Sequence, residues 1–120
     1  MTRTEHLLTI LAEECAEVAQ RVSKAVRFGL AEVQPGQEKT NAQRIMDEMN
    51  DLCAVYLLLT GPDARPETDA LFQSDIPAMR QAIKDKQAKI EKFLAYSAGR
   101  GLVDGIPADP DTLHPEAEGR

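Results

Sequence analysis

The feature that most constrains this chain is a pair of long segments whose apolar residues recur every three or four positions. The first segment runs from Thr4 to Phe28, and the second begins near Asn41 and runs to Thr60. This period places the apolar side chains on one face of an α-helix. A chain of 120 residues has room for one modest core. The sequence therefore predicts a single all-α domain.

Turn-forming residues predict where these two helices begin and end. Thr4 is the expected cap of the first helix, and Gly29 is expected to stop it. Residues 30 to 40 contain a Pro-Gly pair and are predicted to form a connection. The second helix is apolar on nearly all sides beyond Leu52, so we expect its far half to be buried.

A third helix is predicted after a segment that contains three prolines and a glycine, in which residues 70 to 72 are expected to form one short helical turn. Ser74 or Asp75 would cap this helix, which carries Pro77 in its first turn. Its end is expected at Gly99 or Gly101. Its narrow apolar stripe among many lysines is typical of an outer helix or a subunit contact.

The remaining residues, 104 to 120, are rich in Pro, Asp and Gly, and we expect an extended or mobile tail. The folded domain would then comprise residues 1 to 103.

The composition argues against several classes of protein. The formal charge of −6 repels phosphate backbones and anionic lipids, so we expect neither nucleic acid nor a membrane as a partner. The first apolar stretch is too short for a signal peptide or a membrane span, which predicts a cytoplasmic protein. Cys15 and Cys53 lie in apolar helical contexts and are expected to be small buried residues in a reducing compartment.

Four carboxylates interrupt the apolar faces of the first two helices. On a helical wheel of about 100° per residue, Glu14 falls inside the apolar arc, and Glu17 lies at its edge. Glu48 falls among the apolar residues of the second helix, and Asp51 lies about 60° around from it. Each pair has three-residue spacing, so its two side chains project from adjacent turns on one side.

Inward carboxylates need compensation, because burying them together costs free energy unless they are protonated, paired or bound to cations. An all-oxygen set without His or Cys favours hard cations such as Mg²⁺ or Mn²⁺. The Glu-x-x-His pattern of ferritin-like di-iron bundles is absent from the sequence. The sequence therefore predicts metal ligands at Glu14, Glu17, Glu48 and Asp51.

The alternative is a non-enzymatic helical interaction module. Its acidic side chains would form a salt-bridged helix face by pairing with Arg21, Lys24 and Arg44. In particular, Arg21 and Lys24 are placed to pair with the glutamates of their own helix. Such a module predicts that Mg²⁺ and Mn²⁺ leave the stability of the protein unchanged.

The sequence EECAE at residues 13 to 17, followed by EMND at 48 to 51, resembles the EExxE…ExxD signature of MazG-like all-alpha nucleoside triphosphate pyrophosphohydrolases. This superfamily also includes the dimeric dUTPases, and the match covers residues from about 7 to 60. SKAVRFG at 23 to 29 and KIEKFLAYS at 89 to 97 resemble segments of small bacteriophage members. The interval between Glu17 and Glu48 slightly exceeds the usual family spacing, and we expect the surplus in the 30 to 40 connection.

The resemblance implies hydrolysis of a nucleoside triphosphate between its alpha and beta phosphates, which gives the monophosphate and pyrophosphate. It implies two or three Mg²⁺ (or Mn²⁺) ions held by the four carboxylates above. Glu13 would support the ligands or orient the attacking water. The phage likeness makes dGTP or GTP the first substrate choice and the host bacterial cytoplasm the compartment. A dUTPase-like activity and broad housecleaning dNTP hydrolysis are the alternatives.

Basic residues on two helices are candidates for binding the substrate phosphates. Lys24 and Arg27 follow the first carboxylate pair by a turn or more. Lys89, Lys92 and Tyr96 on the third helix are further candidates, acting from a neighbouring subunit. The competing explanation is that lysines on an exposed helix serve solvation.

Three helices are fewer than the four or so that a bundle uses to enclose a site. We therefore expect the helical bundle to be completed by dimerisation, as a homodimer or as a homotetramer made of two dimers. The active sites would then lie near the subunit contacts.

Overall fold

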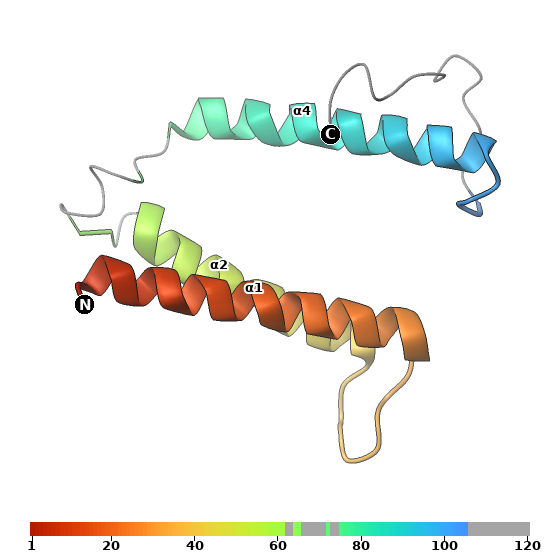
Figure 1. The fold of residues 1–120 in the computed structure, drawn as a ribbon, viewed down its shortest axis with the longest axis horizontal. Coiled ribbons are helices and arrows are strands. Elements are labelled where there is room, and N and C mark those ends of the chain that lie inside the picture. Colours follow the sequence, from red (N-terminus) through yellow and green to blue (C-terminus); the bar gives the residue numbers. More distant parts are fainter. Residues whose placement is uncertain (62–63, 66–71, 73–74, 106–120) are drawn as a thin grey trace. The chain divides into compact units, whose positions relative to one another are not determined.

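The computed structural model describes residues 1–61, 64–65, 72 and 75–105. Its long elements are the helices α1 (Arg3–Phe28), α2 (Asn41–Thr60) and α4 (Ile76–Gly99), as Figure 1 shows. Over these described ranges there is no β-strand, which confirms the prediction of an all-α fold. None of the described helices is long and apolar enough to cross a membrane.

Helix α1 is capped by Thr2, so the predicted cap at Thr4 is wrong. The Thr2 side chain accepts a hydrogen bond from the Glu5 backbone N–H at 3.1 Å, and the Glu5 carboxylate accepts one from the Thr2 N–H at 2.7 Å. This reciprocal pair satisfies two backbone donors that would otherwise lack partners, and it fixes the start of the helix two residues earlier than predicted. Gly29 ends the helix as predicted, with a φ of 103° that glycine adopts readily.

The connection between α1 and α2 is fastened to the start of α2 by Asn41. This side chain is only 3% exposed, and its Nδ2 donates to the Gly29 carbonyl at 2.9 Å and to the Glu32 carboxylate at 3.3 Å. The Asn41 backbone N–H donates to the Glu32 carbonyl, and the Ala42 N–H donates to the Leu30 carbonyl. These bonds fix the position of α2 along α1, and therefore decide which side chains lie opposite each other.

Helices α1 and α2 lie side by side and run in opposite directions, as the sequence colours in Figure 1 show. Their contact is centred on Leu7 of α1 with Val55 and Leu59 of α2. Ile10, Leu11 and Phe72 pack against this cluster. Among the described residues, four apolar side chains are buried: Leu7, Ala25, Val55 and Leu59. The core of this helix pair is therefore small.

The far half of α2 is exposed on one side, contrary to the prediction that it is buried. Val55 and Leu59 face α1 and are buried, but Tyr56 is 40% exposed and Leu57 is 53% exposed. A single neighbouring helix covers only one side of α2, so the apolar residues that point elsewhere stay accessible.

The two cysteines are also exposed, so the prediction that they are small buried residues is wrong. Each lies on a helix of the pair, but neither belongs to the buried cluster at the helix contact. The apolar neighbours that suggested burial are themselves partly accessible. For example, Val22 is 41% exposed and Met49 is 38% exposed.

Residues Asp75–Arg120 form a second compact unit, separate from the unit Met1–Ser74. The Asp75 carboxylate caps α4 by accepting a hydrogen bond from the Ala78 N–H at 3.2 Å, and Pro77 lies in the first turn, as predicted. The helix ends at Gly99, also as predicted. The expected turn at 70 to 72 and the expected tail lie almost entirely outside the described residues. No residue of α4 is buried.

We predict that Asn41→Ala lowers the free energy of unfolding by about 1 to 3 kcal/mol, because the Gly29 carbonyl would lose a buried donor. Urea denaturation monitored by circular dichroism would measure this loss. Asn50→Ala is the matched control, because Asn50 is an exposed residue of the same helix, and we expect a change within about 0.5 kcal/mol. Equal effects of the two substitutions would show that Asn41 does not fasten the connection.

Candidate functional site

Three carboxylates from two helices converge on one side of the α1/α2 pair. Glu14 comes from α1, while Glu48 and Asp51 come from α2, and one oxygen of each lies within 4.8 Å of the others. Glu14 and Glu48 are half-buried, and Asp51 is exposed. The three-residue spacing on α2 brings two oxygens from successive turns to the same side. We call these three residues the carboxylate cluster.

Glu14 carries the electrostatic consequence of this convergence. Partial burial raises the pKa of its carboxyl group above the ordinary value of 4.5, because the charged form loses solvation. Neighbouring negative charges raise the pKa further, in decreasing order Asp51, Glu48, Glu17 and Glu13. Without a cation, the neighbouring carboxylates therefore disfavour the ionised form of Glu14.

An arginine from α1 lies close to the cluster. Arg21 Nε is 4.0 Å from Glu48 Oε1, and the two side chains are 18% and 21% exposed. This distance exceeds that of a good hydrogen bond, so the contact is a long ion pair. The interaction-module alternative pairs the acidic residues with Arg21, so this contact agrees with that alternative, although Arg21 meets Glu48 of α2 and not a glutamate of its own helix. It sets one positive charge against three carboxylates.

Glu17, predicted as a fourth metal ligand, is not among the three residues whose oxygens converge. It is exposed on α1, one turn beyond Glu14, and lies near enough for its charge to raise the pKa of Glu14. Glu13 is exposed as well and has the same electrostatic effect. Both residues therefore border the cluster.

The predicted phosphate-binding residues of α1 lie further along the same helix. Lys24 is half-buried, and its backbone lies about 10 Å from that of Glu17 at 1.5 Å per residue. The exposed Arg27 guanidinium is 5.0 Å from the centre of the Phe28 ring. Neither residue belongs to the carboxylate cluster, and their phosphate roles stay predictions.

The predicted substrate residues Lys89, Lys92 and Tyr96 lie on α4 and are all half-buried. The Tyr96 hydroxyl accepts a hydrogen bond from Arg100 Nη1 at 2.8 Å, and the Arg100 guanidinium is 5.6 Å from the centre of the Tyr96 ring. These residues belong to the second compact unit, and their predicted contacts with a substrate stay a prediction.

A polar cavity that the sequence did not predict lies where the connection meets α2. Its volume is about 370 Å³, and its lining includes Lys39, Arg44 and Asp47. Lys39 Nζ lies 2.7 Å from Asp47 Oδ2, and Arg44 Nη1 donates to Gln34 Oε1 at 2.8 Å. Arg44 therefore bonds to an amide of the connection, whereas the interaction-module alternative paired it with the acidic residues.

No family model matches the chain, and no curated protein or solved structure matches it. The likeness to the MazG-like enzymes accordingly rests on the sequence segments quoted above.

We predict that metal-free protein loses stability as the pH rises through the raised pKa of Glu14. The folded state holds this proton more tightly than the unfolded state, so its loss, as the pH rises from the ordinary pKa to the raised one, disfavours folding. Glu14→Gln should remove this contribution and make the metal-free protein more stable than wild type at neutral pH. Urea denaturation in EDTA from pH 4 to pH 8 would measure both effects. Glu38→Gln, outside the cluster, should behave as wild type.

We also predict that Mg²⁺ or Mn²⁺ raises the melting temperature of the wild-type protein. A cation that binds only the folded state at ten times its Kd adds about 1.4 kcal/mol, which corresponds to several degrees in a domain of this size. Asp51→Asn should abolish the shift, and Asp47→Asn on the same helix should retain it. An unchanged melting temperature of wild type across the metal range would support the interaction module.

Proposed function

We propose that this chain is a metal-dependent nucleotide pyrophosphohydrolase. It would convert a (deoxy)nucleoside triphosphate into the monophosphate and pyrophosphate. The observation that carries the proposal is the convergence of Glu14, Glu48 and Asp51 from two helices, with one oxygen of each within 4.8 Å of the others. The order EECAE…EMND in the sequence supports the same reading.

The donor set suits Mg²⁺ or Mn²⁺, because every candidate ligand atom is a carboxylate oxygen. Glu14, Glu48 and Asp51 would hold the cation, and Glu17 at the border of the cluster would join them or hold a further ion. The raised pKa of Glu14 agrees with this assignment, since a cation would favour the ionised form that the neighbouring acids oppose. When bound, such ions neutralise phosphate charge and make water a better nucleophile near neutral pH.

In the proposed reaction, a water oxygen attacks the alpha phosphorus, and the bond from that phosphorus to the alpha–beta bridging oxygen breaks. Pyrophosphate leaves with the bridging oxygen, and the water proton passes to a carboxylate or to solvent. Glu13, exposed beside the cluster, would orient the attacking water. Lys24 and Arg27 would contact the departing phosphates, and Lys89, Lys92 and Tyr96 would do so from a neighbouring subunit.

For the substrate we propose dGTP or GTP, on the likeness to small phage proteins. The chain offers few aromatic rings for stacking a base, with three Phe, two Tyr and no Trp. The aromatic residues therefore do not identify the base, and the first experiment compares nucleotides with different bases. A homodimer or homotetramer is part of the proposal, because the described helix pair buries few apolar residues by itself.

The test is turnover of all ribo- and deoxynucleoside triphosphates, including dUTP, with Mg²⁺, with Mn²⁺ and with EDTA. Monophosphate, diphosphate and pyrophosphate should be resolved as products. We expect metal-dependent monophosphate and pyrophosphate in equal amounts. Asp51→Asn and Glu48→Gln should reduce turnover by at least about 100-fold. Loss of a residue that merely hydrogen-bonds a metal ligand already reduces activity by about 10- to 100-fold, and loss of the ligand itself should reduce it more.

Asp47→Asn is the matched control for these variants, because Asp47 lies on the same helix and binds Lys39. Its turnover should stay close to that of wild type. Asp51→Asn is the cleaner of the two site variants, since Glu48→Gln also removes the partner of Arg21. Full activity of Asp51→Asn would contradict the assignment of Asp51 as a metal ligand. Turnover restricted to dUTP would identify the dUTPase-like alternative, and no turnover with any substrate would favour the interaction module.

A further inference from the structure

Arg21 is the basic side chain that contacts the carboxylate cluster. It follows Glu14 by seven residues, which is two turns of α1, so both side chains project from the same side of the helix. Helical side chains lean toward the N-terminus of their helix, and Arg21 therefore extends back toward Glu14. Its Nε lies 4.0 Å from Glu48 Oε1. Among the described residues, no other ion pair involves a member of the cluster.

The contact with Glu48 uses little of what the Arg21 guanidinium can bind. The distance of 4.0 Å is longer than a hydrogen bond, and no hydrogen bond between described residues involves this guanidinium. A guanidinium carries five N–H groups and can present two of them side by side to one anion. These donors therefore lie beside the cluster without an acceptor from the described part of the protein.

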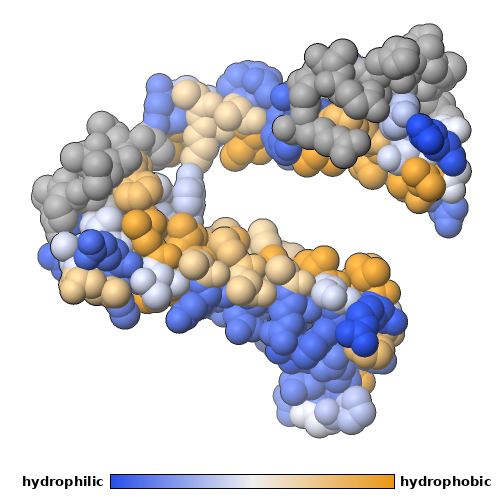
Figure 2. All heavy atoms as spheres, in the orientation of Figure 1, coloured by the Kyte–Doolittle hydropathy of each residue, from blue (hydrophilic) through white to orange (hydrophobic). Residues whose placement is uncertain are grey.

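The cluster lies open to the hydrophilic edge of the α1/α2 pair. In Figure 2 this pair is apolar along one long edge and hydrophilic along the opposite edge. Glu17 and Asp51 each follow a cluster glutamate by three residues, which turns their side chains about 60° around the helix from that glutamate. Because the helices are antiparallel, both turns lead to the same edge, and both residues are exposed. An anion can therefore approach Arg21 from the water on this side.

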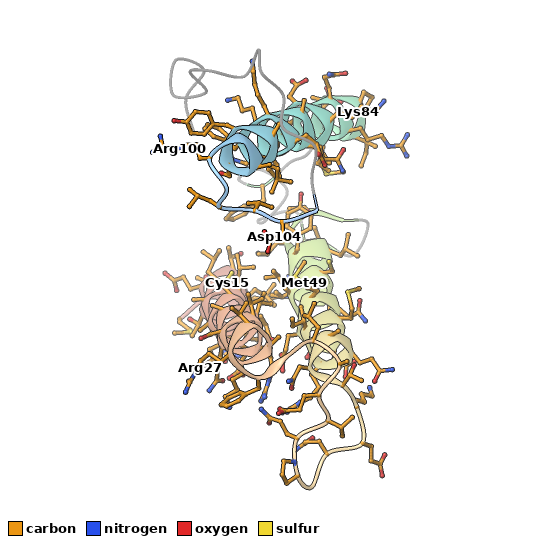
Figure 3. The ribbon with its side chains drawn as sticks, turned by 90° about the vertical axis from the view of Figure 1, so that its right-hand side faces the viewer. Cys15, Arg27, Met49, Lys84, Arg100 and Asp104 are labelled. Atoms are coloured by element: carbon orange, nitrogen blue, oxygen red, sulfur yellow. The ribbon has the colours of Figure 1, made fainter. Side chains whose placement is uncertain are left out.

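The basic residues that follow Arg21 on α1 lie further from the cluster. At 1.5 Å per residue, the backbone of Arg21 lies about 10 Å from that of Glu14. The corresponding separations are about 15 Å for Lys24 and about 20 Å for Arg27. Figure 3 shows Arg27 on the side of α1 that faces away from α2. Arg21 is therefore better placed than either residue to act at the carboxylates.

We propose that Arg21 is the counter-ion of the carboxylate cluster in the metal-free protein, and that it moves from Glu48 to a phosphate of the substrate when the cluster binds cations. This inference rests on the proposed function and adds a phosphate-binding residue to it. A cation and a guanidinium at the same carboxylate repel each other. The long side chain of arginine lets the guanidinium leave, and its paired N–H groups match the geometry of phosphate oxygens.

This exchange predicts opposite effects of Arg21 on two ligands. In the metal-free protein the guanidinium competes with the cation for Glu48, so loss of its charge should strengthen metal binding. Once cations are bound, the same guanidinium attracts phosphate, so loss of its charge should weaken phosphate binding. A purely structural ion pair predicts a different result, because its loss would leave Glu48 less well positioned and would not strengthen the binding of either ligand.

The first measurement is the affinity for Mn²⁺ alone, from the electron paramagnetic resonance signal of the free ion. Arg21→Met keeps an apolar stem and removes the charge. We expect it to bind Mn²⁺ about 2- to 10-fold more tightly than wild type, since a partly exposed ion pair no longer opposes the ion. Lys39→Met is the matched control, because it removes one positive charge and the ion pair with Asp47, and its Mn²⁺ affinity should stay close to that of wild type.

The second measurement is the calorimetric affinity for magnesium pyrophosphate in excess Mg²⁺. This probe has no base, so the result does not depend on which nucleotide the protein prefers. We expect Arg21→Met to weaken binding by at least about 10-fold, because hydrogen bonds between charged groups are lost. Arg21→Lys keeps the charge without the paired N–H groups, and its affinity should lie between those of wild type and Arg21→Met.

A third measurement uses the wild-type protein and does not depend on how Arg21→Met folds. The NMR signal of the Arg21 Nε–H group, assigned by its absence in Arg21→Lys, should shift with Mg²⁺ and shift again with magnesium pyrophosphate. A signal that neither addition changes would overturn the proposal. Unchanged or weaker Mn²⁺ binding by Arg21→Met, or unchanged pyrophosphate binding, would overturn it as well.

The failure of this inference is distinguishable from the failure of the proposed function. A wild-type protein that binds neither Mn²⁺ nor pyrophosphate would reject both. Metal-dependent turnover by wild type, together with an Arg21→Met variant that binds both ligands as wild type does, would reject the exchange and retain the enzyme.

Discussion

The rest of this structure depends on the mutual repulsion of carboxylates held between two antiparallel helices. Glu14, Glu48 and Asp51 lie where apolar side chains would otherwise pack, and the pKa of Glu14 rises in response. Among the described residues, the apolar side chains that are fully buried and offset this unfavourable contact are four: Leu7, Ala25, Val55 and Leu59. In a helix pair with so small a core, a cation that binds the cluster of the folded state would add stability by offsetting this repulsion.

Much of the fold followed from local sequence signals. Apolar periodicity predicted α2 from near Asn41 to Thr60, as found, and Pro77 with Asp75 marks the start of α4. The start of α1 was misplaced because two threonines precede the apolar run, and only Thr2 has a glutamate three residues later. Spacing also predicted that carboxylates from α1 and α2 meet, because three-residue intervals fix the side of a helix from which side chains project.

The sequence did not predict which side chains of α2 are buried or which residues form ion pairs between α1 and α2. The periodicity of α2 shows that its residues are apolar, but it does not show which neighbours cover them, so Tyr56, Leu57 and Cys53 were wrongly expected inside. The Arg21–Glu48 pair depends on how α2 is positioned along α1, which no single-helix pattern contains. Glu17 lies at the edge of its apolar arc. A small rotation of the helix decides whether a residue at this edge joins the carboxylate cluster or stays beside it, and the sequence does not fix that rotation.

The anchoring of Asn41 has a consequence for how the length of this chain can vary. Asn41 lies seven residues before Glu48, two helical turns, so both residues face α1. The positions of Glu48 and Asp51 are therefore set by their distance along the helix from Asn41. The number of residues in the connection before Asn41 does not affect them. A longer connection leaves the cluster intact, whereas one residue inserted between Asn41 and Glu48 turns the α2 carboxylates by about 100° away from Glu14. Insertions in the connection therefore keep the carboxylate cluster together, whereas insertions in α2 between Asn41 and Glu48 separate it.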